Sequence, residues 1–242
     1  MNTEHIEING KKYLVKIYHE DRRNARVSIT SDSINIRLPD FVGRDAGFRE
    51  LMKMKMWAVN KLKENPERFK PEVQKNYKDG DVLKVGNEGY ILKIEFEEKE
   101  SSSAKITGNV IEMAISSNLS TEKQKKHIST LLSRCIARKR LPELHRKLKE
   151  LNTKHFNQKI NKIFFKNAKS RWGSCSEAGN INISTRLLFA PDEVLESVCI
   201  HELAHLIEQN HSEKFWALVE QAMPNYKEAD KWLKENGGSC GF

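Results

Sequence analysis

The first part of the chain alternates apolar and polar residues in short runs, which is the pattern of half-buried strands. Three such runs cover residues 12–17, 25–30 and 33–38. Residues 44–63 instead carry apolar residues three or four positions apart, the spacing of one helix face. The pattern predicts a small antiparallel sheet followed by a helix. Residues 64–80 are polar, contain two prolines and are predicted to be a connector.

Strand-like runs return in the middle of the chain, with glycines between them as turn signals. They cover residues 82–85, 90–96, 104–107 and 110–115. The polar segment at residues 116–121 then marks a change to longer helical patterns. We therefore predict two domains, a β-rich region with one helix at residues 1–118 and a second domain at residues 119–242.

The second domain is predicted to mix helices and strands. In chain order these are a helix at 121–151, strands at 162–166 and 180–188, and helices at 191–209 and 226–234. The strand at 180–188 leads almost directly into the helix at 191–209. Two interpretations of this strand are open. As an edge strand it would pair with an extended peptide, whereas as a core strand it would only support the fold.

The composition fits a globular protein, because 38% of the 242 residues are hydrophobic and 31% are charged. The N-terminus lacks the apolar segment of a signal peptide, and no uncharged apolar stretch is long enough to span a membrane. The four cysteines are scattered and form no C-x-x-C pair. These features predict a cytoplasmic protein without a membrane partner, and they indicate no particular oligomeric state.

The chain is basic, with a net charge of +9, and its lysines and arginines are frequent between Lys123 and Lys154. Apolar residues recur at helical spacing in the same segment, so the simpler interpretation is the solvated face of an amphipathic helix. The alternative is a surface that attracts nucleic acid or an acidic protein.

Residues 201–205 read H-E-L-A-H within the predicted helix at 191–209. Residues four apart lie on one helix face, so His201 and His205 can both bind one metal ion. Glu202 lies beside that position, where a carboxylate can hold and deprotonate a water molecule. The structural alternative is a pair of hydrogen-bonded core histidines beside a surface glutamate. The pattern favours the site of a zinc hydrolase.

A catalytic zinc site needs a third protein ligand and one open position. Glu208 shares the histidine face but lies about 10 Å along the helix from His201, too far to share one ion. His211 is better placed if Asn210 ends the helix in a left-handed turn that directs the next side chain back to the metal. Alternative third ligands further along the chain are Glu220 and Glu228.

Several motifs resemble the YgjP-like metallopeptidase family. They are KSRWGSC at residues 169–175, NIN at 180–182, HELAHLIEQNHSEKFW at 201–216 and MPNY at 223–226, followed by Trp232 and Leu233. The stretch at 201–216 is also similar to the WLM and SprT-like proteases, which are associated with repair of DNA–protein crosslinks. The resemblance to the YgjP-like family extends in order over nearly the whole chain.

The resemblance implies an α+β fold, in which residues 119–242 form a zincin-like metallopeptidase domain after an N-terminal antiparallel β-rich part. It also implies that His201, His205 and His211 hold Zn²⁺ and that Glu202 is the catalytic base. We expect hydrolysis of a protein or peptide substrate. Two alternatives stay open: a zinc-stabilised module that binds nucleic acid, and a protease recruited to DNA-bound proteins.

Two further residues are candidates for contacts with the substrate or the transition state. Arg171 has the charge and the donors to stabilise an oxyanion or to bind a carboxylate, although its segment equally suits a structural turn near the site. Tyr226 is a candidate hydrogen-bond donor, with packing as the alternative. Phe215 and Trp216 are expected to pack the helix that follows His211 against the zinc helix.

Overall fold

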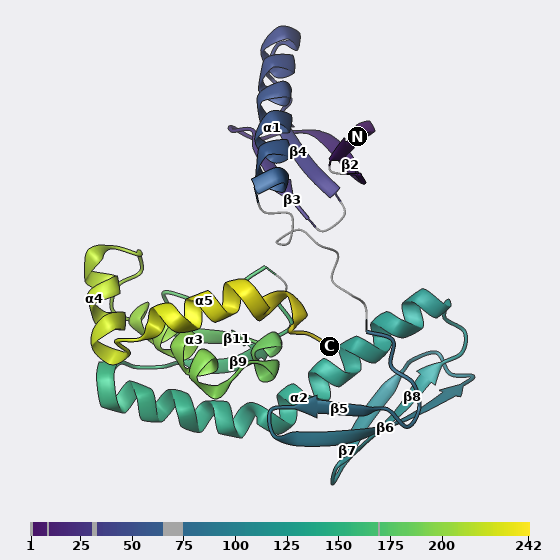
Figure 1. Ribbon diagram of the computed structural model, residues 1–242, viewed down its shortest axis with the longest axis vertical. Coiled ribbons are helices and arrows are strands. Elements are labelled where there is room, and N and C mark those ends of the chain that lie inside the picture. Colours follow the sequence, from purple (N-terminus) through teal and green to yellow (C-terminus); the bar gives the residue numbers. More distant parts are fainter. Residues whose placement is uncertain (1, 9, 31–32, 65–74, 169) are drawn as a thin grey trace. The chain divides into compact units, whose positions relative to one another are not determined.

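A computed structural model describes residues 2–8, 10–30, 33–64, 75–168 and 170–242. The chain forms two compact units, Met1–Val73 and Gln74–Phe242 (Figure 1). Most of the predicted connector at 64–80, and Lys169 at the start of the KSRWGSC run, lie outside the described residues. The mixture of helices and strands in both units confirms the predicted α+β class.

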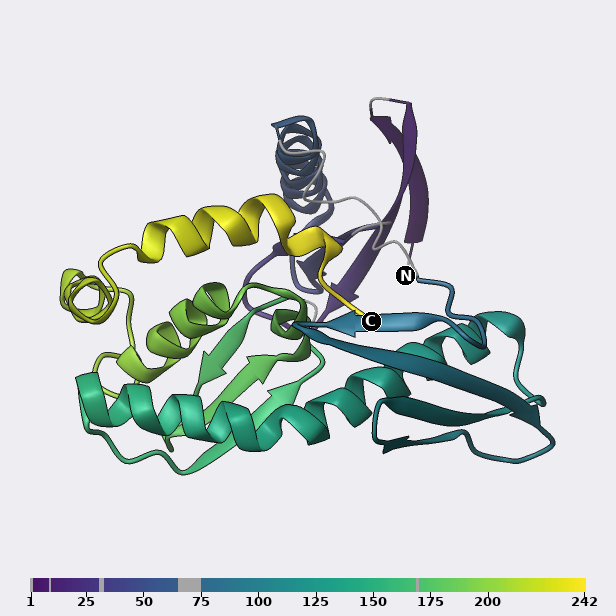
Figure 2. The ribbon, with the colours of Figure 1, turned by 60° about the horizontal axis from the view of Figure 1, so that its bottom comes forward.

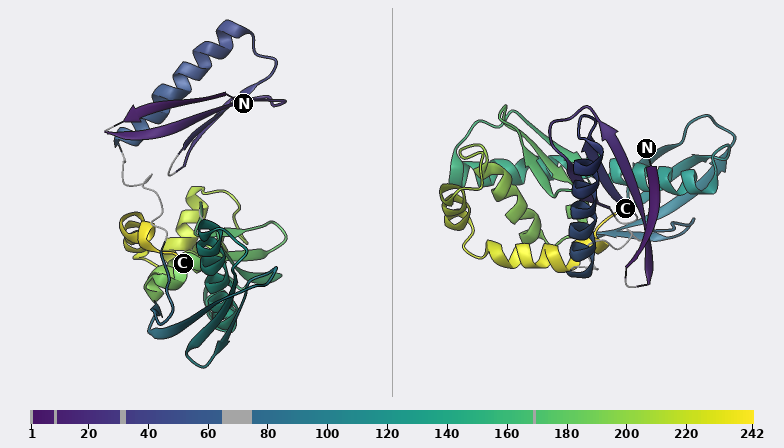
Figure 3. Two further views of the ribbon diagram at one scale, coloured as in Figure 1. Left: turned by 90° about the vertical axis from the view of Figure 1, so that its right-hand side faces the viewer. Right: turned by 90° about the horizontal axis from the view of Figure 1, so that it is seen from above.

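The first unit is a four-stranded sheet with one helix. Its strands are β1 (Asn2–Ile8), β2 (Lys11–Glu20), β3 (Arg26–Ile29) and β4 (Ser33–Pro39), in the order β1-β2-β4-β3. Helix α1 (Arg44–Glu64) contacts β1, β3 and β4, and Figure 3 shows it against one face of the sheet. Ala58 and Leu62 of this helix meet the buried side chains of Val15, Ile34 and Ile36.

The pairing in this sheet differs in one respect from the prediction of an antiparallel sheet. The β1–β2 and β3–β4 pairs are antiparallel, but β2 and β4 are parallel. The parallel pair arises because β4 lies between β2 and β3 in the sheet. Strand β4 is antiparallel to β3 and therefore has the same direction as β2. Strand β1, which alternates in burial as a half-buried strand does, was not among the three predicted runs.

The second unit contains two sheets packed along one long helix. The first sheet consists of β5 (Val82–Val85), β6 (Glu88–Glu97), β7 (Ser103–Thr107) and β8 (Val110–Ser116), in the order β5-β6-β8-β7. The second consists of β9 (Lys162–Lys166), β10 (Gly173–Cys175) and β11 (Asn180–Ser184), in the order β10-β11-β9. Figure 2 shows α2 (Thr121–Leu151) passing along both sheets.

Helix α2 places apolar residues from its two halves into two cores. Ile128, Leu132 and Ile136 pack with β5–β8, whereas Leu144 and Leu148 pack with the second sheet and the later helices. The division between the compact units therefore falls near residue 73 and not at 118/119, because strands β5–β8 share a core with α2. As a boundary between functional domains, the division at 118/119 stays a prediction.

The helices that follow the second sheet are α3 (Asp192–Ala204), α4 (Glu213–Ala222) and α5 (Tyr226–Asn236). The run predicted as a strand at 180–188 forms β11 only as far as Ser184 and continues as a 3₁₀ helix, Thr185–Phe189. Strand β11 lies in the centre of its sheet, so the edge-strand interpretation was wrong for this segment; β10 is an edge strand instead. No described helix combines the length and the apolar character needed to cross a membrane.

Candidate metal centre

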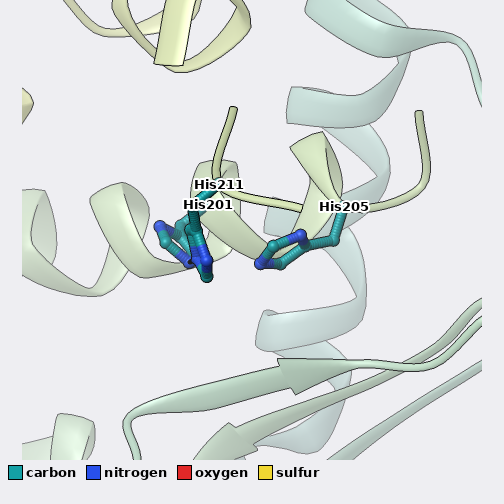
Figure 4. A group of neighbouring side chains, drawn as sticks. All are labelled: His201, His205 and His211. Atoms are coloured by element: carbon teal, nitrogen blue, oxygen red, sulfur yellow. Dashed lines mark hydrogen bonds between the residues drawn. The ribbon is translucent and has the colours of Figure 1, made fainter. Parts of the chain in front are cut away.

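Three imidazole side chains meet where α3 ends and the chain turns towards α4. One ring nitrogen from each of His201, His205 and His211 lies within 4.8 Å of the others. The Nε2 atoms of His201 and His211 are 3.1 Å apart. Figure 4 shows the three rings converging on one region. No other described group of three or more histidines, cysteines or carboxylates has such an arrangement, and Glu220 and Glu228 are both exposed and outside it.

Helix α3 is shorter than predicted but still brings two of these rings together. It was expected to extend from 191 to 209, yet it ends at Ala204. His205 directly follows and keeps right-handed helical angles, φ −66° and ψ −14°, so its side chain stays one turn after that of His201. Tight 3₁₀-type bonds then run from the amide of Leu206 to Leu203 and from that of Ile207 to Ala204, both 3.0 Å.

His211 reaches the cluster by a route other than the predicted one. Asn210 does not adopt the left-handed conformation, because the single described non-glycine residue with positive φ is Asn157. The tight bonds after Ala204 already turn the chain, and the amide of Ser212 donates to the carbonyl of Asn210 at 2.8 Å. The Ser212 hydroxyl then caps α4 by accepting from the amide of Phe215 at 3.4 Å. His211 is thus held between two helix ends.

Phe215 is an apolar residue that packs against all three histidine rings of the cluster. Its side chain is fully buried, and its ring centroid lies 4.8, 4.5 and 4.8 Å from those of His201, His205 and His211. The neighbouring Trp216 has ring centroids 5.9 Å from His201 and 5.8 Å from His211. As predicted, both residues pack α4 against the end of α3. They also restrict the orientations of all three imidazoles.

A backbone hydrogen bond fixes the orientation of His205. Its Nδ1 lies 3.1 Å from the carbonyl oxygen of Glu208, which can only accept, so Nδ1 carries the proton and Nε2 is left with a lone pair that could bind a metal ion. The backbone of Glu208 therefore orients this ring. Burial, followed by the neighbouring histidines, lowers the pKa of His201 to about 4, and burial also lowers that of His205. Both rings are neutral near pH 7, as metal binding requires.

Glu202 is a buried carboxylate beside the histidines. Only 4% of its surface is exposed, and its Oε2 has no hydrogen-bond partner among the described residues. Burial raises the pKa of Glu202 to about 8, and the positive charge of Arg171 opposes that shift. Buried polar atoms are nearly always satisfied, so an unpartnered carboxylate oxygen here indicates a ligand, a solvent molecule or a catalytic role.

Gly173 makes room for this carboxylate, and this contact was not predicted from the sequence. A Cβ atom at position 173 would lie 2.4 Å from Oε1 of Glu202 and 2.7 Å from its Cδ. Edge strand β10 therefore lies directly against the Glu202 side chain. A glycine inside a strand can signal a close approach by another group, and that was the signal available in the sequence.

Trp172, the next residue back, has a structural role. The guanidinium carbon of Arg186 lies 4.1 Å from the centroid of its ring, and a Cβ atom at position 237 would lie 2.4 Å from its Cζ2. Arg186 also donates to the carbonyl of Cys240 at 3.0 Å and to that of Gly237. The indole is thus enclosed between Arg186 and the segment after α5, which holds the start of β10 in place.

The two candidate contact residues lie in different surroundings. Arg171 is exposed beside Trp172, and its charge reaches Glu202. Tyr226 begins α5 and stacks on Trp216, with ring centroids 5.5 Å apart and an interplanar angle of 20°. Trp216 in turn contacts His201 and His211, so Tyr226 is one ring removed from the histidine cluster.

The donor set fits a zinc ion. In a tetrahedral zinc site with Zn–N distances of about 2.0–2.1 Å, ligand nitrogens lie about 3.3 Å apart. The 3.1 Å separation between the Nε2 atoms of His201 and His211 is close to this value, and the ring nitrogens of all three histidines lie within 4.8 Å of one another. Neutral imidazoles suit zinc, and the unpartnered carboxylate of Glu202 supplies the acceptor that a catalytic site requires. The arrangement can therefore hold a metal ion and deprotonate a water molecule.

Comparison with known proteins gives one family. The model of the family described as YgjP-like, metallopeptidase domain, matches residues 23–236. The metallopeptidase zymogen abylysin of Pyrococcus abyssi has 27% sequence identity and a TM-score of 0.35, over 38% of this chain and 92% of that chain. The zymogen jannalysin of Methanocaldococcus jannaschii has 20% identity and a TM-score of 0.34, over 38% and 94%. No curated protein matches the sequence.

Proposed function

The chain belongs to the YgjP-like metallopeptidase family, and from that premise we propose that it hydrolyses peptide bonds with a zinc ion held by His201, His205 and His211. The observation that carries the proposal is the meeting of three imidazole nitrogens beside the buried, unpartnered carboxylate of Glu202. The proposed location is the cytoplasm, where free thiols such as those of the four cysteines persist.

Glu202 is the proposed general base and acid. When bound, zinc supplies a Lewis acid that polarises the scissile carbonyl group and lowers the pKa of a water molecule towards about 7. Glu202 accepts the proton of the attacking water at Oε2, the buried oxygen that has no hydrogen-bond partner among the described residues. It then donates this proton to the nitrogen of the leaving amine.

The substrate is proposed to bind as an extended strand along β10. Of the described strands, only β11 pairs with β10, and it does so along one edge. The other edge of β10 therefore offers backbone donors and acceptors to a peptide. Gly173 of this strand touches Glu202, so a paired substrate lies next to the proposed base. Tyr226 is a proposed donor to the transition state, and a Tyr226→Phe variant that keeps its full kcat would remove that role.

Metal content and cleavage, measured together, test the proposal. We expect about one zinc per wild-type chain, and we expect cleavage of an unfolded protein that stops with a chelator and returns with added zinc. His211→Ala should bind zinc more weakly and lose cleavage, because it removes one of three ligands. Glu220→Ala is the matched control, since this exposed carboxylate lies outside the cluster. Wild-type protein that binds no zinc would contradict the proposal.

A second candidate function rests on the basic surface of α2. Six of its basic side chains are exposed and form no ion pair with a described residue: Lys123, Lys126, Arg134, Arg138, Arg146 and Lys149. The 31 residues of this helix span about 46 Å. The proposed role is to bring the protease to nucleic acid, where it would act on bound proteins.

Salt dependence tests this second role. DNA binding through these side chains should weaken steeply with salt, with a slope of about 0.9 per phosphate contacted, and the Arg134→Glu/Arg138→Glu double variant should lower that slope. Binding to DNA with zinc but without cleavage would favour the zinc-stabilised module. No DNA binding at about 50 mM salt would contradict both the DNA-recruited protease and the zinc-stabilised module.

A further inference from the structure

A small cavity opens beside the edge strand β10. Its volume is about 250 Å³, below the range of about 300–1,000 Å³ typical of sites for drug-sized ligands, so it suits a single side chain. It extends from the end of β9 across the loop before β10 and reaches Gly173, the residue that touches Glu202. The polar side chains that line it belong to Lys166, Ser170, Arg171, Ser174, Asn182 and Ser184.

The side chains that line this cavity carry a net positive charge. Two of its lining residues, Lys166 and Arg171, are cationic, and no acidic residue lines it. Both cations are exposed, and neither forms an ion pair with a residue that the structure describes. The hydroxyls of Ser170 and Ser174 and the amide of Asn182 add hydrogen-bond donors. A carboxylate is the ligand that this combination suits best, since a guanidinium can bind both of its oxygens.

The strand register places the cavity where a substrate side chain would point. Ser174 pairs with Asn182, and their side chains are joined by a 3.3 Å hydrogen bond on the sheet face away from α3. Gly173 pairs with the buried Ile183 on the opposite face, towards Glu202. Lys166, paired with Ser184, stands on the same outer face as Asn182. A peptide paired with β10 would direct alternate side chains over this outer face.

We propose that the cavity is a subsite for an aspartate or glutamate side chain of the substrate, bound by Lys166 and Arg171. The inference rests on the proposed peptidase function and gives that function a sequence preference. Arg171 thereby acquires a positioning role: it holds a substrate carboxylate while the scissile bond lies near Glu202. The free carboxylate at the end of a peptide has the same chemistry, so the test must separate the two sources.

A peptide series tests the subsite. The peptides have blocked ends and differ at one position at a time, which holds Glu, Gln or Lys. We expect one position at which wild-type kcat/KM for Glu exceeds that for Gln about tenfold or more, the contribution of hydrogen bonds to a charged group. In the Lys166→Glu/Arg171→Glu variant the preference should reverse in favour of Lys. The ratio is taken within each variant, so any general loss of activity cancels.

Lys162→Glu is the matched control. Lys162 is an exposed lysine on β9 and on the same outer face, but it does not line the cavity. This variant should keep the wild-type ratio. Equal kcat/KM for Glu and Gln at every position, with cleavage intact, would overturn the subsite and leave the proposed function standing. A preference for peptides with a free C-terminus and no internal Glu preference would overturn the side-chain assignment. No cleavage of any peptide would overturn both.

Discussion

Glu202 and Gly173 lie close together in the candidate site. The carboxylate is 4% exposed, and no atom larger than hydrogen fits on the α-carbon of Gly173 without striking it. The contact sets how closely the proposed base can approach the edge strand, and so where the carbonyl group of a proposed substrate would lie. Proton transfer needs heavy-atom distances of about 2.6–3.2 Å, so small displacements of this carboxylate matter.

Gly173→Ala should therefore reduce catalysis while leaving the metal in place. The new methyl group would lie 2.4–2.7 Å from the Glu202 side chain, which must move. A misplacement of about 1 Å costs about 10²-fold in rate, so we expect kcat to fall by about that factor with zinc content unchanged. Gly89→Ala, also in a strand, is the control, because its Cβ meets Val82 at an ordinary 3.5 Å. Wild-type kcat in Gly173→Ala would contradict the account.

For residues of the candidate site that lie close in the sequence, their spacing along the chain was enough to predict that they lie close in space. His201 and His205 are four apart on a helix, so their proximity follows from helix geometry. The contacts of Gly173 with Glu202 and of Phe215 with all three histidines join different elements, and no sequence period encodes them. Arg186 was missed for the same reason, since its partners Trp172 and Gly237 are distant in the chain.

At the scale of elements, the segment after α5 braces the start of β10. Trp172 is enclosed between the Arg186 guanidinium and Gly237, and the Cys240 carbonyl accepts a second hydrogen bond from Arg186. Because Trp172 directly precedes Gly173, this packing fixes the strand that contacts Glu202. The packing thus links the C-terminal segment to the candidate site through neighbouring side chains.

Gly237→Ala should destabilise the protein, and Gly238→Ala should not. Gly237 has helical angles, φ −60° and ψ −22°. Alanine has a higher intrinsic preference than glycine for this backbone conformation, so the backbone itself would not oppose the substitution. Its methyl group, however, would lie 2.4 Å from the Trp172 ring, and overpacking of this kind costs about 1–3 kcal/mol. A Cβ at Gly238 meets nothing within 4 Å. Denaturant unfolding measures the difference, and equal stabilities of the two variants would show that the brace is absent.

The hydrophobic pattern predicted the bounds of an element correctly where that element is long or half-buried. The predicted helix at 121–151 and strands at 82–85 and 162–166 have the observed bounds. The helix at 191–209 was predicted to be too long, because the apolar residues Leu206 and Ile207 continue its hydrophobic pattern after the backbone has turned. The place of β11 within its sheet depends on pairing with β9 and β10, which the pattern of one strand does not encode.

At the scale of the whole molecule, the two units have separate cores. One core lies between α1 and the sheet of β1–β4, and two further cores lie along α2 in the second unit. The candidate metal centre lies entirely in the second unit. The sequence pattern cannot reveal that β5–β8 share a core with α2, the helix that follows them, and the division of functional domains at 118/119 stays a prediction.

Removal of the metal should therefore lower the stability of the second unit alone. A ligand present at about 1,000 times its Kd stabilises the folded state by about 4 kcal/mol, which corresponds to about 10 °C for a unit of this size. Calorimetry with and without a chelator should show one transition that moves and one that does not. A single transition, or equal shifts in both, would contradict separate units with the metal in one of them.

The most direct test of the central claim is cleavage by Glu202→Gln at full zinc occupancy. Glutamine keeps the shape of the side chain and should leave zinc content at the wild-type level, because Glu202 is not a proposed ligand. It cannot accept the proton, so we expect kcat to fall by about 10²–10⁴-fold. Retained cleavage by a zinc-loaded Glu202→Gln protein would contradict the proposed role of this carboxylate, and with it the mechanism.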